Sequence, residues 1–131
     1  MEKKNDIRVI GIILSEATFK RIPNVTFEEK LIENKLNNNI GINIRQDGIT
    51  TIFKVDLKRI NKENKKEEVS FSVTYVGMFS RPTEMTDDEC KIFAKKDAPA
   101  IIYPYIRETV SAMSLKAGIG PISLPIINFK K

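Results

Sequence analysis

The amino-acid sequence predicts an α+β fold: a four-stranded antiparallel meander covered by one main helix, with a shorter helix before it. Three observations lead to this fold class. Apolar and polar residues alternate in three segments between positions 40 and 75, which is the pattern of half-buried strands. A helix-start signal follows near position 86, and apolar residues then recur at helical spacing. With 131 residues, the chain fits a single domain over residues 1–131.

The composition excludes several function classes. The chain has one cysteine, Cys90, and no histidine, so it has no Ser-His-Asp or Cys-His catalytic machinery and no zinc site of the usual kind. It also has no glycine-rich phosphate loop. We therefore expect no enzyme, no catalytic residues, no metal and no other cofactor. The lone cysteine, the charged start without a signal-peptide pattern and the lack of a membrane-length apolar run favour the cytoplasm.

The net charge of +5 raises the question of nucleic-acid binding. The densest basic stretch, KRINKENKK at residues 58–66, is interrupted and followed by Glu63, Glu67 and Glu68. A phosphate-binding surface needs cations aligned on one face. The mixed charge favours a solvated hairpin tip over a nucleic-acid site.

The first strand is predicted from a nearly continuous β-branched run at residues 7–14, which continues through Phe19 and stops at Pro23-Asn24. Such a run suits a strand that is covered on both faces or paired at an interface. Residues 25–39 are Asn-rich. They are expected to form a connecting loop with a short helical turn between Phe27 and Leu31.

Three strands joined by short turns are predicted next, which implies antiparallel pairing of consecutive strands. Asp47-Gly48 is read as the first tight turn, because glycine accepts a positive φ, and residues 61–66 as the second. The expected inward side chains are Ile40, Ile42 and Ile44, then Phe53, Val55 and Leu57, then Val69, Phe71, Val73 and Tyr75.

Two helices are predicted to cover the sheet. Thr86 and Glu89 fit a capping box at the start of the shorter helix. The main helix runs from near Pro99 to about Ala117 and stops at Gly118. The residues expected to face the sheet are Ile102, Ile106, Val110, Met113 and Ala117. A neighbouring stripe, Tyr103, Arg107, Ser111 and Ser114, is either a close helix–helix contact or a solvent face.

These residues resemble a known family. The run APAIIYPYIRE at residues 98–108, followed by Gly118, Pro121, Leu124, Pro125 and Asn128-Phe129, resembles the main helix and crossover of the SecB export chaperones. Gly77-Met78-Phe79 is similar to the end of the last strand in that family. The helix-plus-crossover match covers about 32 residues, whereas residues 7–76 are similar in pattern only.

The resemblance implies an ATP-independent chaperone, or holdase, that binds unfolded or non-native polypeptides in an exposed apolar groove. The candidate peptide-binding residues are Phe71, Val73, Met78, Phe79, Ile119, Ile122 and Leu124. It also implies a homo-oligomer, a dimer or a tetramer, in which the first strand pairs across the dimer and the main helices stack. Tyr105, Arg107, Glu108 and Ser111 are then expected at that stacking surface.

Two alternatives stay open: a SecB-fold adaptor that binds one specific partner protein, and a dedicated antitoxin-type chaperone. Two departures from the family argue against recruitment of the motor protein SecA. The stretch Ala17-Thr18-Phe19-Lys20-Arg21 lacks the acids that help the family meet SecA. The chain ends at Lys131, where family members continue into a further helix. A role in protein export stays open.

Overall fold

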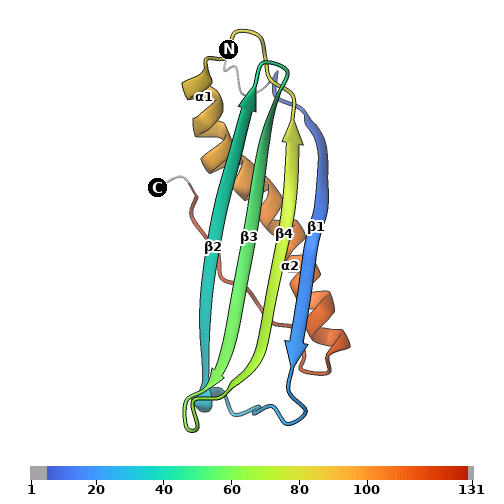
Figure 1. The fold of residues 1–131 in the computed structure, drawn as a ribbon, viewed down its shortest axis with the longest axis vertical. Coiled ribbons are helices and arrows are strands. Elements are labelled where there is room, and N and C mark those ends of the chain that lie inside the picture. Colours follow the sequence, from blue (N-terminus) through green and yellow to red (C-terminus); the bar gives the residue numbers. More distant parts are fainter. Residues whose placement is uncertain (1–5, 130–131) are drawn as a thin grey trace.

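The structure, a computed structural model, describes residues 6–129; the charged start at residues 1–5 and the last two lysines lie outside them. Figure 1 shows a four-stranded antiparallel sheet with a long helical run crossing one face. In chain order the elements are β1 (Val9–Arg21), a 3-10 turn (Glu29–Leu31), β2 (Ile32–Arg45), β3 (Gly48–Asn61), β4 (Glu67–Phe79), α1 (Asp87–Ile92), a π-helical segment (Phe93–Asp97) and α2 (Ala98–Lys116). The predicted fold class is confirmed.

The strand order across the sheet is β1-β4-β3-β2. Strands β2, β3 and β4 form the expected meander, but β1 joins the sheet beside β4 instead of beside β2. The link from β1 to β2 is too long for a tight hairpin turn and crosses the end of the sheet. The buried carboxylate of Glu68 holds this link, because it accepts hydrogen bonds from the Thr26 backbone N–H (2.7 Å) and the Asn61 side chain (3.2 Å).

The expectation of a loop over residues 25–39 is wrong for its second half. Strand β2 begins at Ile32, and residues 32–45 pair continuously with β3. This strand is one of the two edges of the sheet, and in its first half, residues 32–38, only Leu36 packs against the core. Polar residues on an edge strand discourage pairing with other chains. The Asn-rich composition is therefore that of an edge strand. Because it lacks a clear apolar alternation, residues 32–39 were not predicted as a strand.

The first hairpin turn lies one residue earlier than predicted, at Gln46-Asp47. Gly48 is already the first residue of β3 and pairs with Arg45. Its φ is not positive, so the reason given for the glycine was wrong. The close approach of the Phe79 carbonyl oxygen, 3.3 Å from where a Cβ would stand, leaves little space for a side chain.

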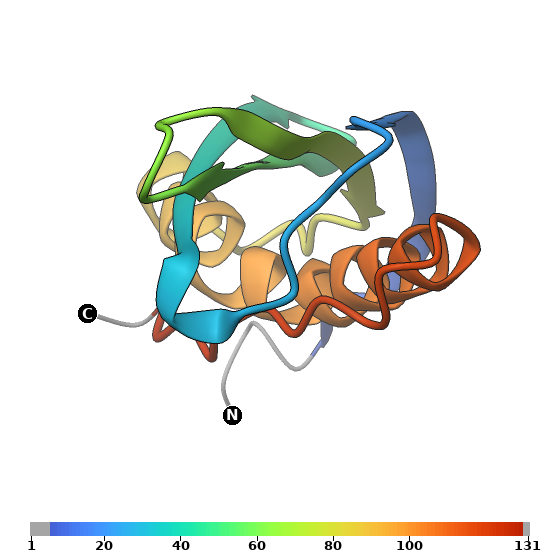
Figure 2. The same ribbon diagram turned by 90° about the horizontal axis from the view of Figure 1, so that it is seen from below.

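The predicted faces of β3 and β4 are confirmed. Their inward residues are buried, among them Phe53, Val55 and Val73 at 0% exposure, and their outward neighbours are not. Figure 2 shows that the helices and the C-terminal segment all lie on this inner side of the curved sheet. A second, smaller cluster around Phe79 and Phe93 packs α1 and the π-helical segment onto the end of the sheet.

The two predicted helices form one continuous helical run. Its start is the predicted capping box, in which Thr86 Oγ1 accepts from the Glu89 backbone N–H and the Glu89 carboxylate accepts from that of Thr86. The π-helical segment joins the run to α2 just before Pro99. Pro99 has no N–H, and its ring would clash with the carbonyl four residues earlier in an α-helix. A wider turn at this point relieves that clash.

On α2, Ile102, Ile106 and Val110 are fully buried against the sheet, as predicted. The stripe of Tyr103, Arg107, Ser111 and Ser114 does not form one external face: Tyr103 and Ser114 are buried inside the chain. Ser114 Oγ donates to the Val110 carbonyl oxygen (2.7 Å), so its polar atom needs no partner from another helix.

Gly77 of β4 lies directly against Ile102 of α2. A Cβ on this glycine would stand 2.7 Å from Ile102 Cδ1 and 2.9 Å from the Phe79 ring, and both of these side chains are buried. A glycine is therefore required for this packing, since even a methyl group would overlap it.

We predict that Gly77→Ala lowers the free energy of unfolding by about 1–3 kcal/mol, because the added methyl group overpacks the helix–sheet contact. Urea unfolding followed by circular dichroism measures this change. Gly41→Ala is the matched control, since its Cβ would meet only Ile52 Cβ at an ordinary 3.8 Å. Equal losses in the two variants would contradict this packing.

Candidate functional site

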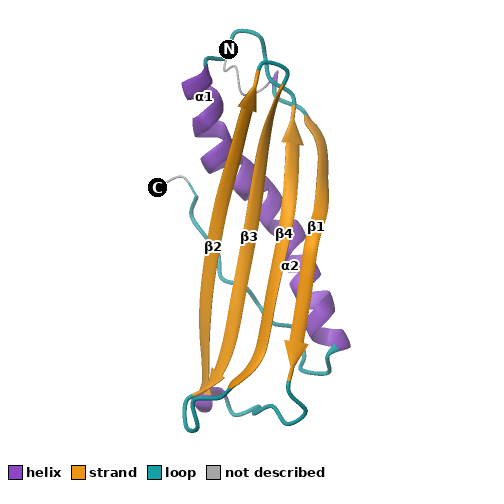
Figure 3. Cartoon of the chain, in the orientation of Figure 1, coloured by secondary structure: helices purple, strands orange, loops and turns teal. Residues whose placement is uncertain are grey.

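The segment after α2, residues 118–129, runs without helix or strand over the inner face of the sheet (Figure 3), and we call it the crossover segment. It begins with a Schellman motif, in which the Ile119 N–H donates to the Ser114 carbonyl and the Gly118 N–H to that of Leu115. Gly118 has a φ of +73°, which a residue with a side chain adopts only under strain. The predicted stop at Gly118 is therefore confirmed, and it turns the chain back along the helix.

Aromatic contacts hold the far end of the crossover segment. The Tyr103 hydroxyl on α2 donates to the Pro125 carbonyl oxygen at 2.6 Å. The Phe129 ring packs edge-on against Phe53 and Tyr103, with centroid distances of 5.4 and 5.7 Å. The segment is thus fixed both to the helix and to the sheet.

Arg21, at the end of β1, holds the near end. Its guanidinium donates to the Ala117 carbonyl oxygen (2.5 Å) and also to those of Ile22 and Pro23. A cation at this position also offsets the negative end of the helix dipole. No local pattern predicts this contact, because Arg21 and Ala117 are 96 positions apart in the chain.

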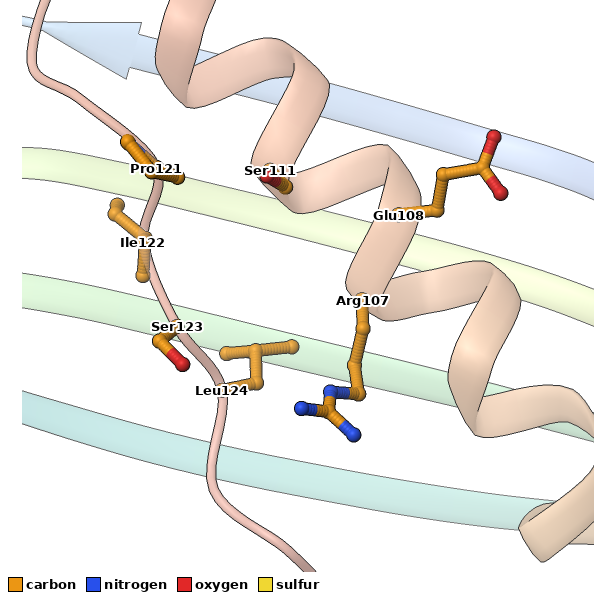
Figure 4. Close-up of a pocket in the computed structure, with 7 residues that line it drawn as sticks. All are labelled: Arg107, Glu108, Ser111, Pro121, Ile122, Ser123 and Leu124. Carbon is orange, nitrogen blue, oxygen red and sulfur yellow. The ribbon is translucent and has the colours of Figure 1, made fainter.

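An open groove of about 360 Å³ lies between α2 and the crossover segment. Figure 4 shows the side chains that line it, which are Arg107, Glu108, Ser111, Pro121, Ile122, Ser123 and Leu124. The groove brings together two sets of predicted residues: Ile122 and Leu124 from the peptide-binding set, and Arg107, Glu108 and Ser111 from the interface set. This mixture of apolar and polar side chains is more typical of a peptide-binding site than of a catalytic site.

The neighbouring charges Arg107 and Glu108 point apart. Arg107 extends toward Leu124 and the crossover segment, whereas Glu108 extends in the other direction, away from the crossover segment (Figure 4). The Arg107 guanidinium lies over the Tyr103 ring, 5.9 Å from its centroid. Burial raises the pKa of the Tyr103 hydroxyl, while the Arg107 charge acts in the opposite sense. Tyr103 therefore stays protonated at neutral pH and remains a hydrogen-bond donor.

The expected exposure of the peptide-binding set needs a correction. Phe71, Val73, Phe79, Ile119, Ile122 and Leu124 are all less than 10% exposed and belong to the core clusters. The alternation of β4 turns Phe71, Val73 and Phe79 toward the helices. The crossover residues are buried because they cover the part of the sheet that α2 does not reach. Only Ile122 and Leu124 also line the groove.

Met78 lies on the opposite face of the sheet from this groove. It pairs with Gly11 of β1 and Thr50 of β3, and a Cβ on Gly11 would stand 3.2 Å from Met78 Cε. Met78 and Phe79 are adjacent on a strand, so their side chains point to opposite faces. The two residues therefore do not belong to one groove.

Exposed apolar side chains gather along β1. Val9, Ile10, Ile13 and Leu14 are 46–65% exposed on an edge strand. On α2, Tyr105 is 45% exposed, with its ring tilted against Tyr75 at 6.0 Å, and Glu108 is exposed beside it. Apolar residues on an unpaired edge are a typical feature of strands that pair with another chain.

Residues 6–129 contain neither a metal site nor a membrane-spanning helix. Within that range, no group of three or more acidic or cysteine side chains could hold a metal ion. No helix in the described part of the chain combines the length and apolarity that a membrane span requires.

Comparison with known proteins identifies relatives along the whole chain. The SecB family, described as preprotein translocase subunit SecB, matches residues 2–131. An uncharacterized protein of Methanocaldococcus jannaschii is 32% identical over 127 residues, covering 93% of this chain and 74% of that protein. The protein-export protein SecB of Orientia tsutsugamushi (strain Boryong) is 28% identical over 97 residues, covering 72% of this chain and 60% of that protein. The match therefore spans less than two thirds of that SecB.

A solved structure has the same fold. The SecB-like chaperone of Mycobacterium tuberculosis, in complex with a ChAD peptide from the HigA1 antitoxin, matches with a TM-score of 0.79. The match covers 93% of this chain and 91% of that chain at 16% sequence identity. The SecB-like architecture expected from the sequence is confirmed.

We predict that Tyr103→Phe loosens the crossover segment, because it removes the hydrogen bond to the Pro125 carbonyl. Hydrogen–deuterium exchange over residues 118–129 should become faster, and the free energy of unfolding should fall by about 0.5–1.5 kcal/mol. Tyr105→Phe is the control, because it removes a hydroxyl from the same helix but from a half-exposed ring that packs against Tyr75 of β4. Unchanged exchange in Tyr103→Phe would show that this bond does not hold the segment.

Proposed function

The chain belongs to the SecB family, and we propose that it is an ATP-independent chaperone that holds non-native polypeptides in the groove between α2 and the crossover segment. The observation that carries this proposal is the groove itself. It is open, mixed apolar and polar on the crossover side, where Ser123 stands among Pro121, Ile122 and Leu124, and polar on the helix side. We place this activity in the cytoplasm and assign it no cofactor.

Holding requires no chemistry. A groove that binds the unfolded state of a client, and not its folded state, shifts the equilibrium of the client by mass action. One short groove gives weak binding. Several grooves in an oligomer, each engaging a segment of the same chain, add avidity because every bound segment raises the effective concentration of the next.

A dedicated partner is the second candidate function. The structural relative from Mycobacterium tuberculosis is in complex with a peptide from an antitoxin, and it has the same fold. The small volume of the groove favours one short segment over a long client. A single high-affinity peptide, with no suppression of aggregation for other clients, would distinguish this function from general holding.

Homo-oligomer formation is part of the proposal. The apolar side chains of β1 lie on an open strand edge, which a second copy can cover by extending the sheet. The exposed face of α2, with Tyr105 and Glu108, is the second surface that we assign to contacts between copies. Arg107 is directed into the groove and is not assigned to this surface.

Recruitment of SecA is not part of the proposal. Lys20 and Arg21 give the end of β1 a positive charge, and Arg21 is engaged with the end of α2. The export role named for the SecB relatives therefore needs its own test for this chain.

We predict that Ser111→Trp weakens client binding at least about tenfold, because the indole fills the groove. The measurement is light scattering from reduced, unfolded lysozyme at stoichiometric ratio, without nucleotide. Wild type should suppress aggregation and Ser111→Trp should not. Lys116→Trp, on the same helix but outside the groove, is the control. Normal suppression by a folded Ser111→Trp would place the client elsewhere.

We predict that Ile10→Asp lowers the oligomeric state, because a charge replaces an apolar side chain at the proposed strand-edge contact. Sedimentation velocity measures the mass in solution. Ile126→Asp is the matched control, since Ile126 is 89% exposed and lies far along the chain on the crossover segment. If wild type is already a monomer, or if both variants keep its mass, β1 is not the contact.

A further inference from the structure

We propose that the groove selects client segments that carry a carboxylate among apolar side chains, and that Arg107 binds this carboxylate. The inference rests on the proposed function, since it names the class of client that the same groove takes. It predicts a preference for glutamate or aspartate at one position of the bound segment.

The charge inside the groove is positive. Two charged residues line it, but the Glu108 carboxylate extends away while the Arg107 guanidinium extends toward Leu124 (Figure 4). The ion pairs found within residues 6–129 involve Arg45, Arg81 and Lys58, and none of them involves Arg107. The guanidinium is therefore available for a carboxylate from outside the chain.

Tyr103 attracts this guanidinium toward the crossover side of α2. Its ring lies under the Arg107 guanidinium at 5.9 Å, and its hydroxyl is bonded to the Pro125 carbonyl. The distance lies at the outer limit of a cation–π contact, so the exposed guanidinium keeps its N–H groups free to donate. Those N–H groups form the fork that matches the two oxygens of a carboxylate.

The remaining lining fits a peptide that is otherwise apolar. The apolar part of the lining comes from Pro121, which is exposed, and from Ile122 and Leu124, which are nearly buried. The Ser111 and Ser123 side chains stand on the two walls. A volume of about 360 Å³ is near the lower end of the usual range for ligand sites. The groove therefore accommodates a short motif, and a single charge within that motif has a large share in recognition.

The net charge of the whole chain also favours clients that carry a carboxylate. The net charge of +5 attracts acidic segments and repels basic ones at long range. Nucleic acid would also be attracted, but a stacked base needs an open aromatic face. Tyr103, the ring beside Arg107, is buried, so the groove itself offers no open aromatic face to a base.

The test compares two dye-labelled peptides of leucine and valine that differ only in a central glutamate or glutamine. Fluorescence anisotropy should show that wild type binds the glutamate peptide about fivefold more tightly, and that added salt reduces this preference. Arg107→Gln should bind both peptides equally, whereas Arg107→Lys should keep part of the preference. Lys116→Gln removes the same charge from the same helix outside the groove and should keep all of it.

The outcomes separate this inference from the proposed function. Equal binding of both peptides by wild type would overturn the carboxylate site and leave the chaperone proposal standing. A full preference in folded Arg107→Gln would also overturn it. Failure of both peptides to bind, together with no suppression of aggregation, would overturn both proposals. Displacement of the glutamate peptide by a single-stranded oligonucleotide through Arg107 would assign the site to phosphate instead.

Discussion

One helix is too narrow to cover the apolar face of this sheet, and the rest of the structure depends on that constraint. A helix with its side chains is about 10–12 Å wide. Four strands spaced by about 4.8 Å span roughly 15–20 Å. Helix α2 therefore buries Ile102, Ile106 and Val110 against the sheet, and the crossover segment covers the rest with Ile119, Ile122, Leu124 and Phe129. The second layer is thus half helix and half irregular chain, as Figure 2 shows from the end.

The boundary between these halves produces the groove. A helix presents side chains toward its neighbours, whereas an irregular segment also presents backbone, so the two pack less closely than two helices would. The groove opens along this boundary between Ser111 on α2 and Ser123 on the crossover segment. The crossover wall is attached at both ends, at one by Arg21 and at the other by Tyr103 and Phe129. Coverage of the core and the proposed binding of clients therefore have the same structural origin.

The sequence predicted the elements whose signals are local. The alternation around Phe53 and Phe71, the Thr86 capping box and the stop at Gly118 each depend on a few neighbouring residues, and each is confirmed. Strand β2 was missed because its first half is polar on the exposed face and at the free edge, where apolar alternation is not required. The burial of Ile119 and Ile122 could not be predicted, since it depends on how far α2 extends across the sheet. Phe79 is different: its position on β4 already placed it opposite Met78, and the pattern alone excluded a shared groove.

The central claim is that clients lie between α2 and the crossover segment and not on the outer face of the sheet. Site-specific photo-crosslinking tests it most directly. A photoreactive phenylalanine analogue at Ser123 places the reactive group at the groove, and the same analogue at Met78 places it on the opposite face of the sheet. The account predicts crosslinks to an unfolded client from position 123 and few from position 78. Crosslinks from position 78 with none from position 123 would contradict it.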